Sequence, residues 1–320
     1  MTLFLKPLKA LSAAILMAGA ACSQPVSEGA GATGTSWSIN PGGDLNAFFD
    51  CLEDQGATLV SAHRGGPHKG YPENALETME ALLAEAPAIM EVDVATSADG
   101  VLFLLHDDTL ERTTTGSGEA SDYRWAEIEA LRLKDESGAV TPFHPVRLDD
   151  ALRWAAGRTI LQLDIKRSTR YADIARTLND QHAEDRVVLI ANTLAQAEIL
   201  HRLMPETMIS LTLNSQSDLN RAVAAGVPDN SLLGFTGVET PRPRLYSVLN
   251  NRKVEVIFGT LGGRSSIDAE IARSGEENRY ADLAADGVDV IATDRPKAAF
   301  AALQAAGRTS KAGLCGVNKH

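Results

Sequence analysis

The feature that most constrains the fold is a regular alternation of short apolar runs, rich in β-branched residues, with longer amphipathic runs. In the longer runs apolar residues recur at helical spacing, whereas the short runs have the length and composition of buried strands. Eight short runs are each followed by a helix-like segment, and they begin at Thr58, Ile89, Thr159, Arg186, Met208, Leu232, Val254 and Val288. Eight βα units in one chain predict an α/β protein built as a (β/α)₈ TIM barrel.

A doubly wound open sheet is the alternative architecture. Such sheets generally contain fewer units and carry a Gly-rich nucleotide-binding turn, which this sequence lacks. The chain has 320 residues, and a barrel of roughly 250 residues is common. We therefore assign residues 44–306 to a single barrel domain.

Three segments interrupt or flank the predicted barrel. Residues 107–147 are polar, rich in Thr and Gly, and long for a connection, which indicates a small insertion after the second barrel strand. Residues 23–43 have the composition of a flexible linker, and residues 307–320 resemble a surface tail.

The first 22 residues have the pattern of an export signal. Lys6 and Lys9 precede the small apolar run Ala10–Ala21, which is shorter than the about 20 residues that span a bilayer. The run ends in Gly19-Ala20-Ala21-Cys22, which is similar to a bacterial lipobox except that Gly19 replaces the usual Leu. Ordinary cleavage after Ala20 is the alternative. Either route predicts an exported protein, periplasmic or anchored at Cys22 and facing the periplasm.

Charge and cysteine content restrict the partners. The formal net charge is −12, which argues against nucleic acid or an anionic membrane surface as a partner. Membrane contact is expected only through a lipid at Cys22. The other cysteines, Cys51 and Cys315, lie near the two ends of the mature chain. Because barrel ends tend to meet and exported proteins are oxidised, we expect a Cys51–Cys315 disulfide.

A group of carboxylates predicts a metal site. Glu91 and Asp93 are two residues apart on an apolar strand, so both side chains face the same side. Two facing carboxylates repel each other unless a cation lies between them. Asp164 ends the next apolar run and would be the third ligand; the alternative is a salt bridge between Asp164 and Lys166. Oxygen ligands suit one divalent cation, Ca²⁺ or Mg²⁺, better than Zn²⁺.

Two histidines at strand ends predict proton transfer. His63 and His106 each end a short apolar run, and imidazoles titrate near neutrality, as an acid–base pair requires. Arg64 offers a planar set of donors for phosphate oxygens. Glu73 is a weaker site candidate, and Asn74 with Glu77 is expected to cap a helix.

These residues resemble the glycerophosphodiester phosphodiesterase family. The similarity rests on H-R-G at residues 63–65, P-E-N at 72–74, E-x-D at 91–93, H-D at 106–107, R-T-T at 112–114 and the strand-to-helix segment 287–296. It is dense from Ser61 to Gly118, returns near Asp164 and at the C-terminus, and is weak between Tyr171 and Val254.

The resemblance implies hydrolysis of glycerophosphodiesters to glycerol 3-phosphate and an alcohol, through a cyclic phosphate that water opens. It makes His63 and His106 the acid–base pair, Glu91 and Asp93 metal ligands, and Arg64 a phosphate contact. It also makes Lys166 an electrostatic partner near the phosphate.

The chain departs from the family pattern at two positions. The family usually has Glu at the position of Asp164. An Asp at this position is similar to the related sphingomyelinase D-like enzymes. The segment 257–260 lacks the usual aromatic strand end, so Phe258 is expected to form the wall against the glycerol. Two other functions are retained as alternatives: a phospholipase D or sphingomyelinase D-like activity on lysolipids, and a non-catalytic exported binding lipoprotein.

Overall fold

Eight parallel strands form a closed barrel in the computed structural model, which describes residues 36–320. They are β2 (Leu59–Ala62), β3 (Ile89–Thr96), β5 (Leu161–Ile165), β6 (Val187–Ala191), β7 (Met208–Thr212), β8 (Leu232–Phe235), β9 (Glu255–Gly259) and β10 (Val290–Thr293). Each strand pairs with the next, β10 pairs with β2, and pairing of β2 with β3 closes the ring. The predicted barrel is confirmed.

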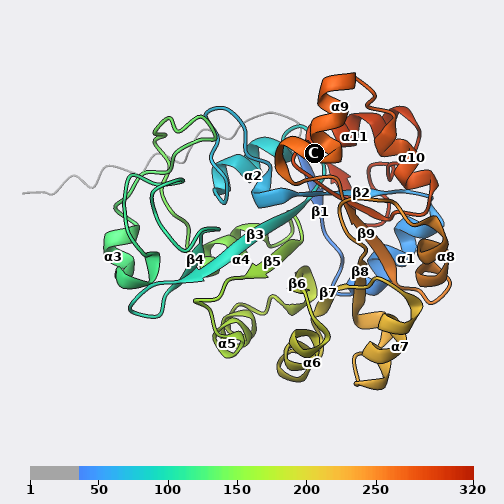
Figure 1. Cartoon of the computed structure of the whole chain (residues 1–320), viewed down its shortest axis with the longest axis horizontal. Helices are drawn as coiled ribbons and strands as arrows, with labels where there is room; N and C mark the ends of the chain where they lie inside the picture. The colour runs from blue at the N-terminus through green and yellow to red at the C-terminus, as the bar shows by residue number, and fades with distance from the viewer. Residues whose placement is uncertain (1–35) are drawn as a thin grey trace, which may run out of the picture. The chain divides into compact units, whose positions relative to one another are not determined.

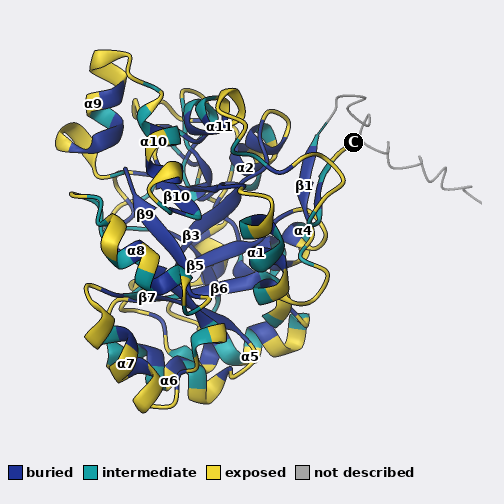
Figure 2. Ribbon diagram, turned by 90° about the vertical axis from the view of Figure 1, so that its right-hand side faces the viewer, coloured by how far each residue is buried: buried dark blue, intermediate teal, exposed yellow. Residues whose placement is uncertain are grey.

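Helices alternate with the strands and cover the outside of the barrel (Figure 1). They are α2 (Leu76–Leu83), α4 (Leu148–Ala155), α5 (Tyr171–Gln181), α6 (Leu194–Leu203), α7 (Gln216–Ala224), α8 (Pro243–Asn250), α9 (Ile267–Ser274), α10 (Arg279–Ala285) and α11 (Pro296–Ala305). Figure 2 shows that the strands are buried and that the helices expose their outer faces. Gly275, whose φ is 76°, ends α9 in the left-handed conformation and so separates α9 from α10.

Short helices complete the connections. Five single turns of 3₁₀ helix occur in the described chain: η1 (His63–Gly65), η2 (Ala120–Asp122), η3 (Glu184–Arg186), η4 (Asp229–Ser231) and η5 (Gly263–Ser265).

The insertion follows the second barrel strand, as predicted. Strand β4 (Leu102–Leu104) runs antiparallel to β3, and helix α3 (Trp125–Ile128) lies in the long segment after it. This segment has a small apolar core of its own, which includes Phe103, Leu110 and Trp125. The insertion is therefore a packed subdomain at one side of the barrel (Figure 1).

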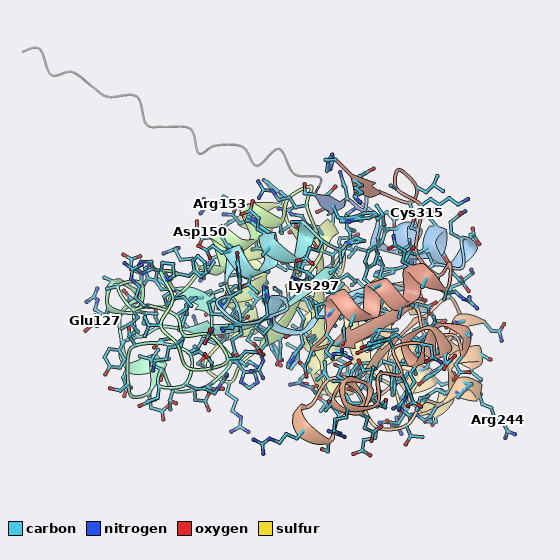
Figure 3. All side chains as sticks on the ribbon, turned by 90° about the horizontal axis from the view of Figure 1, so that it is seen from above. Glu127, Asp150, Arg153, Arg244, Lys297 and Cys315 are labelled. Atoms are coloured by element: carbon cyan, nitrogen blue, oxygen red, sulfur yellow. A yellow bond between two sulfur atoms is a disulfide. The ribbon has the colours of Figure 1, made fainter. Side chains whose placement is uncertain are left out.

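The two ends of the described chain are tied together. Strand β1 (Trp37–Ile39) pairs antiparallel with β11 (Val317–Lys319), so the flexible linker predicted up to residue 43 is wrong over these buried residues. Helix α1 (Leu45–Asp54) carries Cys51, whose disulfide to Cys315 confirms the predicted pairing, with Cα atoms 5.6 Å apart. Figure 3 marks Cys315 beside this helix.

The predicted export signal over residues 1–22 and the predicted acylation site at Cys22 both lie outside the described residues. Among residues 36–320 no helix has the length and apolar character needed to cross a membrane.

Candidate active site

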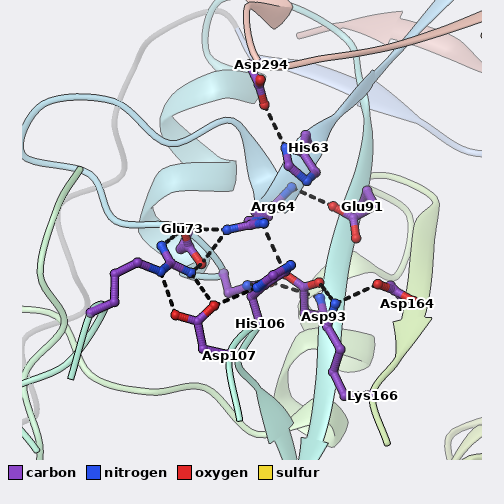
Figure 4. A network of polar contacts seen from close by, with 12 residues as sticks. His63, Arg64, Glu73, Glu91, Asp93, His106, Asp107, Asp164, Lys166 and Asp294 are labelled. Atoms are coloured by element: carbon purple, nitrogen blue, oxygen red, sulfur yellow. Dashed lines mark hydrogen bonds and ion pairs between the residues drawn. The ribbon is translucent and has the colours of Figure 1, made fainter. Parts of the chain in front are cut away.

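The residues with predicted chemical roles meet at the carboxyl ends of the first barrel strands. His63 directly follows β2, Glu91 and Asp93 lie on β3, and Asp164 lies on β5. Because the strands are parallel, these positions face one mouth of the barrel. Figure 4 shows them around a single space, joined by a chain of polar contacts.

The three carboxylates form an acidic triad. One oxygen from each of Glu91, Asp93 and Asp164 lies within 4.8 Å of the others. Asp93 and Asp164 are paired in register on neighbouring strands, and Asp93 is only 1% exposed. Burial, together with the charge of Asp93, raises the pKa of Glu91 to about 8. Such a set of oxygens is suited to a hard divalent cation, which would relieve this repulsion.

Lys166 compensates part of the negative charge. Its Nζ lies 2.6 Å from Oδ1 of Asp93 and 2.6 Å from Oδ2 of Asp164. Burial lowers the pKa of Lys166, but the two carboxylates outweigh it and raise the pKa above its ordinary value. The alternative salt bridge to Asp164 is therefore present, within a triad whose geometry also allows a cation.

Asn74 does not cap a helix, which corrects the sequence prediction. Helix α2 begins at Leu76, and its N-cap residue Ala75 makes no side-chain cap bond. Asn74 instead has a φ of 58° and is buried against β3. Its Nδ2 donates to Asp93 Oδ2 at 2.8 Å, and the Asp93 N–H donates to Asn74 Oδ1 at 3.0 Å. Asn74 thus fixes the orientation of Asp93.

A tight turn positions His63 and Arg64. Arg64 has a φ of 53°, and its backbone N–H donates to Glu91 Oε2 at 2.7 Å. The turn needs glycine at position 65, because a Cβ there would lie 2.7 Å from Met79 of α2. The H-R-G segment therefore links the strand end to the acidic triad.

His63 is paired with a carboxylate from the last barrel strand. Its Nδ1 lies 2.6 Å from Oδ1 of Asp294, which follows β10. Burial lowers the pKa of His63, but the hydrogen bond to Asp294 and the charge of Glu91 outweigh it, so the pKa is raised. The contact fixes the ring, because it occupies Nδ1 and leaves Nε2 for other partners.

His106 is also paired with a carboxylate. Its Nδ1 lies 2.7 Å from Oδ1 of Asp107. Arg112 donates to both oxygens of Asp107, at 2.6 and 2.9 Å, and also to both oxygens of Glu73, at 2.7 and 2.9 Å. Glu73 accepts from the Nη1 of Arg64 at 3.1 Å. Both predicted acid–base residues therefore have an orienting carboxylate.

A cavity of about 270 Å³ opens beside the acidic triad. It has a polar side towards the first strands and an apolar side towards the last ones. Its lining includes His63, Glu91, Gln162, Asp164, Ile190, Asn192, Ser210, Thr212, Phe235, Ile257, Leu261 and Ala292.

Phe258 is not part of this cavity, so its predicted role as a wall against the glycerol is wrong. Successive residues of a strand point to opposite sides, and Ile257 is the one that faces the cavity. Phe258 is fully buried on the outer side of β9, with its ring centroid 6.4 Å from that of Tyr246 on α8. The aromatic residue in the lining is Phe235.

A second crevice, of about 320 Å³, lies at the opposite end of the strands. It is lined by residues that precede β6, β7 and β8, and by the start of α1. Among the described residues that line this crevice there is no histidine, so they do not combine an imidazole with carboxylates as the barrel mouth does.

The sequence pattern predicts no role for three residues of the network, namely Asp107, Arg112 and Asp294. Each lies in one of the motifs that carry the family resemblance, and the position of Asp294 directly after the last barrel strand is a signal for a site residue. In a closed barrel the last strand lies beside the first, as the pairing of Thr293 with Ala62 shows.

The fold and site define a TIM-barrel protein that has two histidines, each paired with a carboxylate, and an acidic triad at the carboxyl ends of its strands. Residues 63–239, more than half of the chain, match the model of the glycerophosphoryl diester phosphodiesterase family. The chain belongs to this family.

Individual relatives agree with this assignment. A glycerophosphoryl diester phosphodiesterase from Parabacteroides distasonis, known from a crystal structure, has 31% sequence identity to this chain. The superposition covers 85% of this chain and 94% of that protein, with a TM-score of 0.76. The glycerophosphodiester phosphodiesterase of Bacillus altitudinis is 31% identical over 166 residues, 48% of this chain and 66% of that protein. Glycerophosphodiester phosphodiesterase 1 of Bos taurus is 40% identical over 80 residues, 25% of this chain and 24% of that protein. The chain thus matches less than two thirds of the length of these two relatives.

Proposed function

We propose that the protein is a metal-dependent hydrolase of glycerophosphodiesters, which releases glycerol 3-phosphate and an alcohol. The observation that carries this proposal is the meeting of two histidine–carboxylate pairs with an acidic triad at one barrel mouth. Family membership supports the same reaction.

The residues take the following roles. His63 and His106 exchange protons with the substrate, and Glu91, Asp93 and Asp164 hold one divalent cation, Ca²⁺ or Mg²⁺. When bound, the cation would polarise a phosphoryl oxygen and orient the attacking hydroxyl. The donor set fits this role because it consists of oxygens from three carboxylates close to one another.

The reaction has two steps, formation of a cyclic phosphate and its opening by water, and the two histidines transfer the protons in both. A hydroxyl of the substrate's glycerol attacks the phosphorus and gives its proton to one histidine, while the other histidine protonates the departing alcohol. The product of this step is a cyclic phosphate. Water then opens the ring, with the proton transfers reversed, and yields glycerol 3-phosphate.

Cationic side chains supply the remaining contacts to the phosphate. Arg64 and Lys166 lie beside the triad, and each is already held by carboxylates, Arg64 by Glu73 and Lys166 by Asp93 and Asp164. Both donors are therefore preorganised at the positions where phosphate oxygens would bind. The cavity next to them, with Phe235 and Leu261, is the place for the organic part of the substrate.

The distribution of exposed apolar residues does not favour a lysolipid substrate. Among the described residues, five large hydrophobic side chains are exposed: Val140, Ile199, Leu203, Val223 and Leu314. Only Val140 lies on the insertion. An enzyme that extracts a lipid chain would need a broader apolar rim at the barrel mouth.

We also propose that the protein is exported, and that Cys22 is the attachment site of a lipid. The disulfide between Cys51 and Cys315 supports export, because such bonds persist in oxidising compartments. Radiolabelled palmitate incorporated by the full chain and lost in Cys22→Ala is the expected result. A soluble product cleaved after Ala20 would contradict the anchor and leave export intact.

The central test is hydrolysis of glycerophosphocholine, glycerophosphoethanolamine, glycerophosphoinositol and a lysolipid, with glycerol 3-phosphate as the measured product. We expect turnover of the glycerophosphodiesters and loss of turnover after treatment with EDTA. Replacing His63 or His106 by Ala should reduce the rate by about 10²–10⁴-fold. Near wild-type rates in both variants would exclude the acid–base pair.

A further inference from the structure

Arg112 connects the insertion to the candidate site. Its guanidinium makes four hydrogen bonds, two to Asp107 and two to Glu73, all between 2.6 and 2.9 Å. Asp107 contacts the ring of His106, and Glu73 contacts the guanidinium of Arg64. One side chain thus touches the partners of two residues that the proposed function uses.

The backbone around Arg112 is fixed by the core of the insertion. Leu110 is 1% exposed and packs in the small apolar core of this segment. The Thr114 N–H and its hydroxyl both donate to the Leu110 carbonyl, at 3.0 and 2.7 Å. The Lys134 N–H donates to the Thr113 carbonyl at 2.8 Å. Arg112 therefore extends from a rigid base, although its own side chain is 47% exposed.

We propose that Arg112 is a positioning residue, which orients His106 through Asp107 and Arg64 through Glu73. The inference rests on the proposed function and adds a role for the insertion. Asp107 is the residue next to His106 and is partly exposed, so its carboxylate would be free to turn to solvent without a second partner. Two bidentate contacts from one planar guanidinium fix both carboxylates at once, which a Lys ammonium cannot do.

The electrostatics are consistent with this arrangement. Hydrogen bonds from Arg112 hold the pKa of Asp107 well below its usual range. Partial burial opposes this effect, and the contact with His106 adds to it. Asp107 therefore remains ionised, and its charge is shared between the arginine and the imidazole.

The first experiment compares the Arg112→Ala and Arg112→Lys variants with the wild type. Because a small displacement of a catalytic group costs up to about 100-fold in rate, we expect kcat to fall by about 10–100-fold in both variants. KM should change by less, and millimolar guanidinium should restore part of the alanine variant's rate. Arg124→Ala is the matched control, since Arg124 is also in the insertion and its side chain is 75% exposed. Among the described residues its ion-pair partner is Asp99, which lies outside the network of Arg112.

The second experiment combines Arg112→Ala with Asp107→Asn. If Arg112 acts through Asp107, the double variant should lose less than the product of the two single losses. Glu73→Gln weakens the contacts of Glu73 to Arg64 and Arg112, so this variant should also have a lower kcat than the wild type. Thermal midpoints identify any variant that has lost its fold.

Two results would overturn the inference. One is an Arg112→Ala variant as active as Arg124→Ala, and the other is full multiplicativity of the Arg112 and Asp107 effects without guanidinium rescue. A wild-type protein that hydrolyses no glycerophosphodiester would instead overturn the proposed function, so the two failures are distinguishable.

Discussion

His63 and Asp294 are 231 positions apart in the chain, yet Nδ1 of the first lies 2.6 Å from Oδ1 of the second. The contact exists because β10 pairs with β2, so the residues that follow these two strands are neighbours. Barrel closure therefore gives His63 its orienting carboxylate.

Replacing Asp294 by Asn should lower the pKa of His63 and slow catalysis. Burial opposes protonation of His63, and the Asp294 hydrogen bond is the largest of the contributions that together outweigh it, so its loss shifts the His63 pKa downwards. We expect kcat to fall by roughly 10²–10⁴-fold, as for other oriented histidines. An NMR titration of the metal-free protein measures the pKa, and Asp282→Asn, an exposed position on α10, is the control. An unchanged His63 pKa in Asp294→Asn would contradict the assignment.

The same pair also makes stability depend on pH. Because the pKa of His63 is raised by folding, its protonated form stabilises the protein fully below the ordinary value of about 6.5. This contribution is lost as the pH rises through the folded-state pKa. The loss should be smaller in Asp294→Asn.

Removal of one carboxylate from the acidic triad should weaken cation binding. We expect Asp164→Asn to lower the affinity for Ca²⁺ or Mg²⁺ by at least about tenfold. Asp164→Glu, which keeps the charge on a longer side chain, should bind the cation better than Asp164→Asn. Isothermal titration of EDTA-treated protein measures both. Equal affinity in wild type and Asp164→Asn would remove Asp164 from the ligand set.

The disulfide should contribute substantially to stability. It links Cys51 on α1 to Cys315 beside β11, a separation of 264 positions, so it restricts the unfolded chain strongly. Replacing both cysteines by Ala should lower the free energy of unfolding by about 2–5 kcal/mol. Urea denaturation with and without reductant provides the measurement. In the double variant the reductant should have no effect, and a sensitivity that persists there would point to another cause.

Two buried acids at the other end of the barrel should reduce stability as the pH rises. Burial raises the pKa of Glu255 to about 8 and that of Asp289 to about 7. Within residues 36–320, neither side-chain oxygen of Glu255 has a hydrogen-bond partner. The folded state therefore binds more protons than the unfolded state between about pH 4.5 and pH 8, and the free energy of unfolding falls across this window.

Replacing Glu255 by Gln removes its share of this dependence. The decrease in unfolding free energy between pH 5 and pH 8 should then be smaller by roughly 1–3 kcal/mol. Denaturation curves at several pH values measure the difference. Parallel pH profiles for wild type and Glu255→Gln would show that Glu255 is ionised in the folded protein.

Phe235 and Phe258 should have separable effects, because the first lines the cavity and the second packs under α8. Phe258→Ala should lower the free energy of unfolding by about 3–5 kcal/mol with little change in KM. Phe235→Ala should raise KM for the glycerophosphodiesters. Steady-state kinetics and denaturation of both variants give the comparison, and the reverse pattern would restore Phe258 to the substrate site.

The sequence alone determined the eight βα units, the position of the insertion and the residues of the acidic triad. These features are local: strand and helix periods repeat along the chain, and Glu91 and Asp93 share a side because strand residues alternate. The Cys51–Cys315 disulfide could be predicted from the sequence for a topological reason, because the two ends of a closed barrel lie close together.

Only the tertiary structure decided which side chains touch. Asp294 reaches His63 because the last strand closes on the first. Arg112 reaches Glu73 because the insertion packs around its own apolar core at the side of the barrel. Phe258 was misassigned because the inward side of β9 depends on its register with β8 and β10. Asn74 was misassigned because its carboxylate partner, Asp93, lies on a different element. Local periodicity specifies elements, whereas contacts between distant residues depend on how those elements pack.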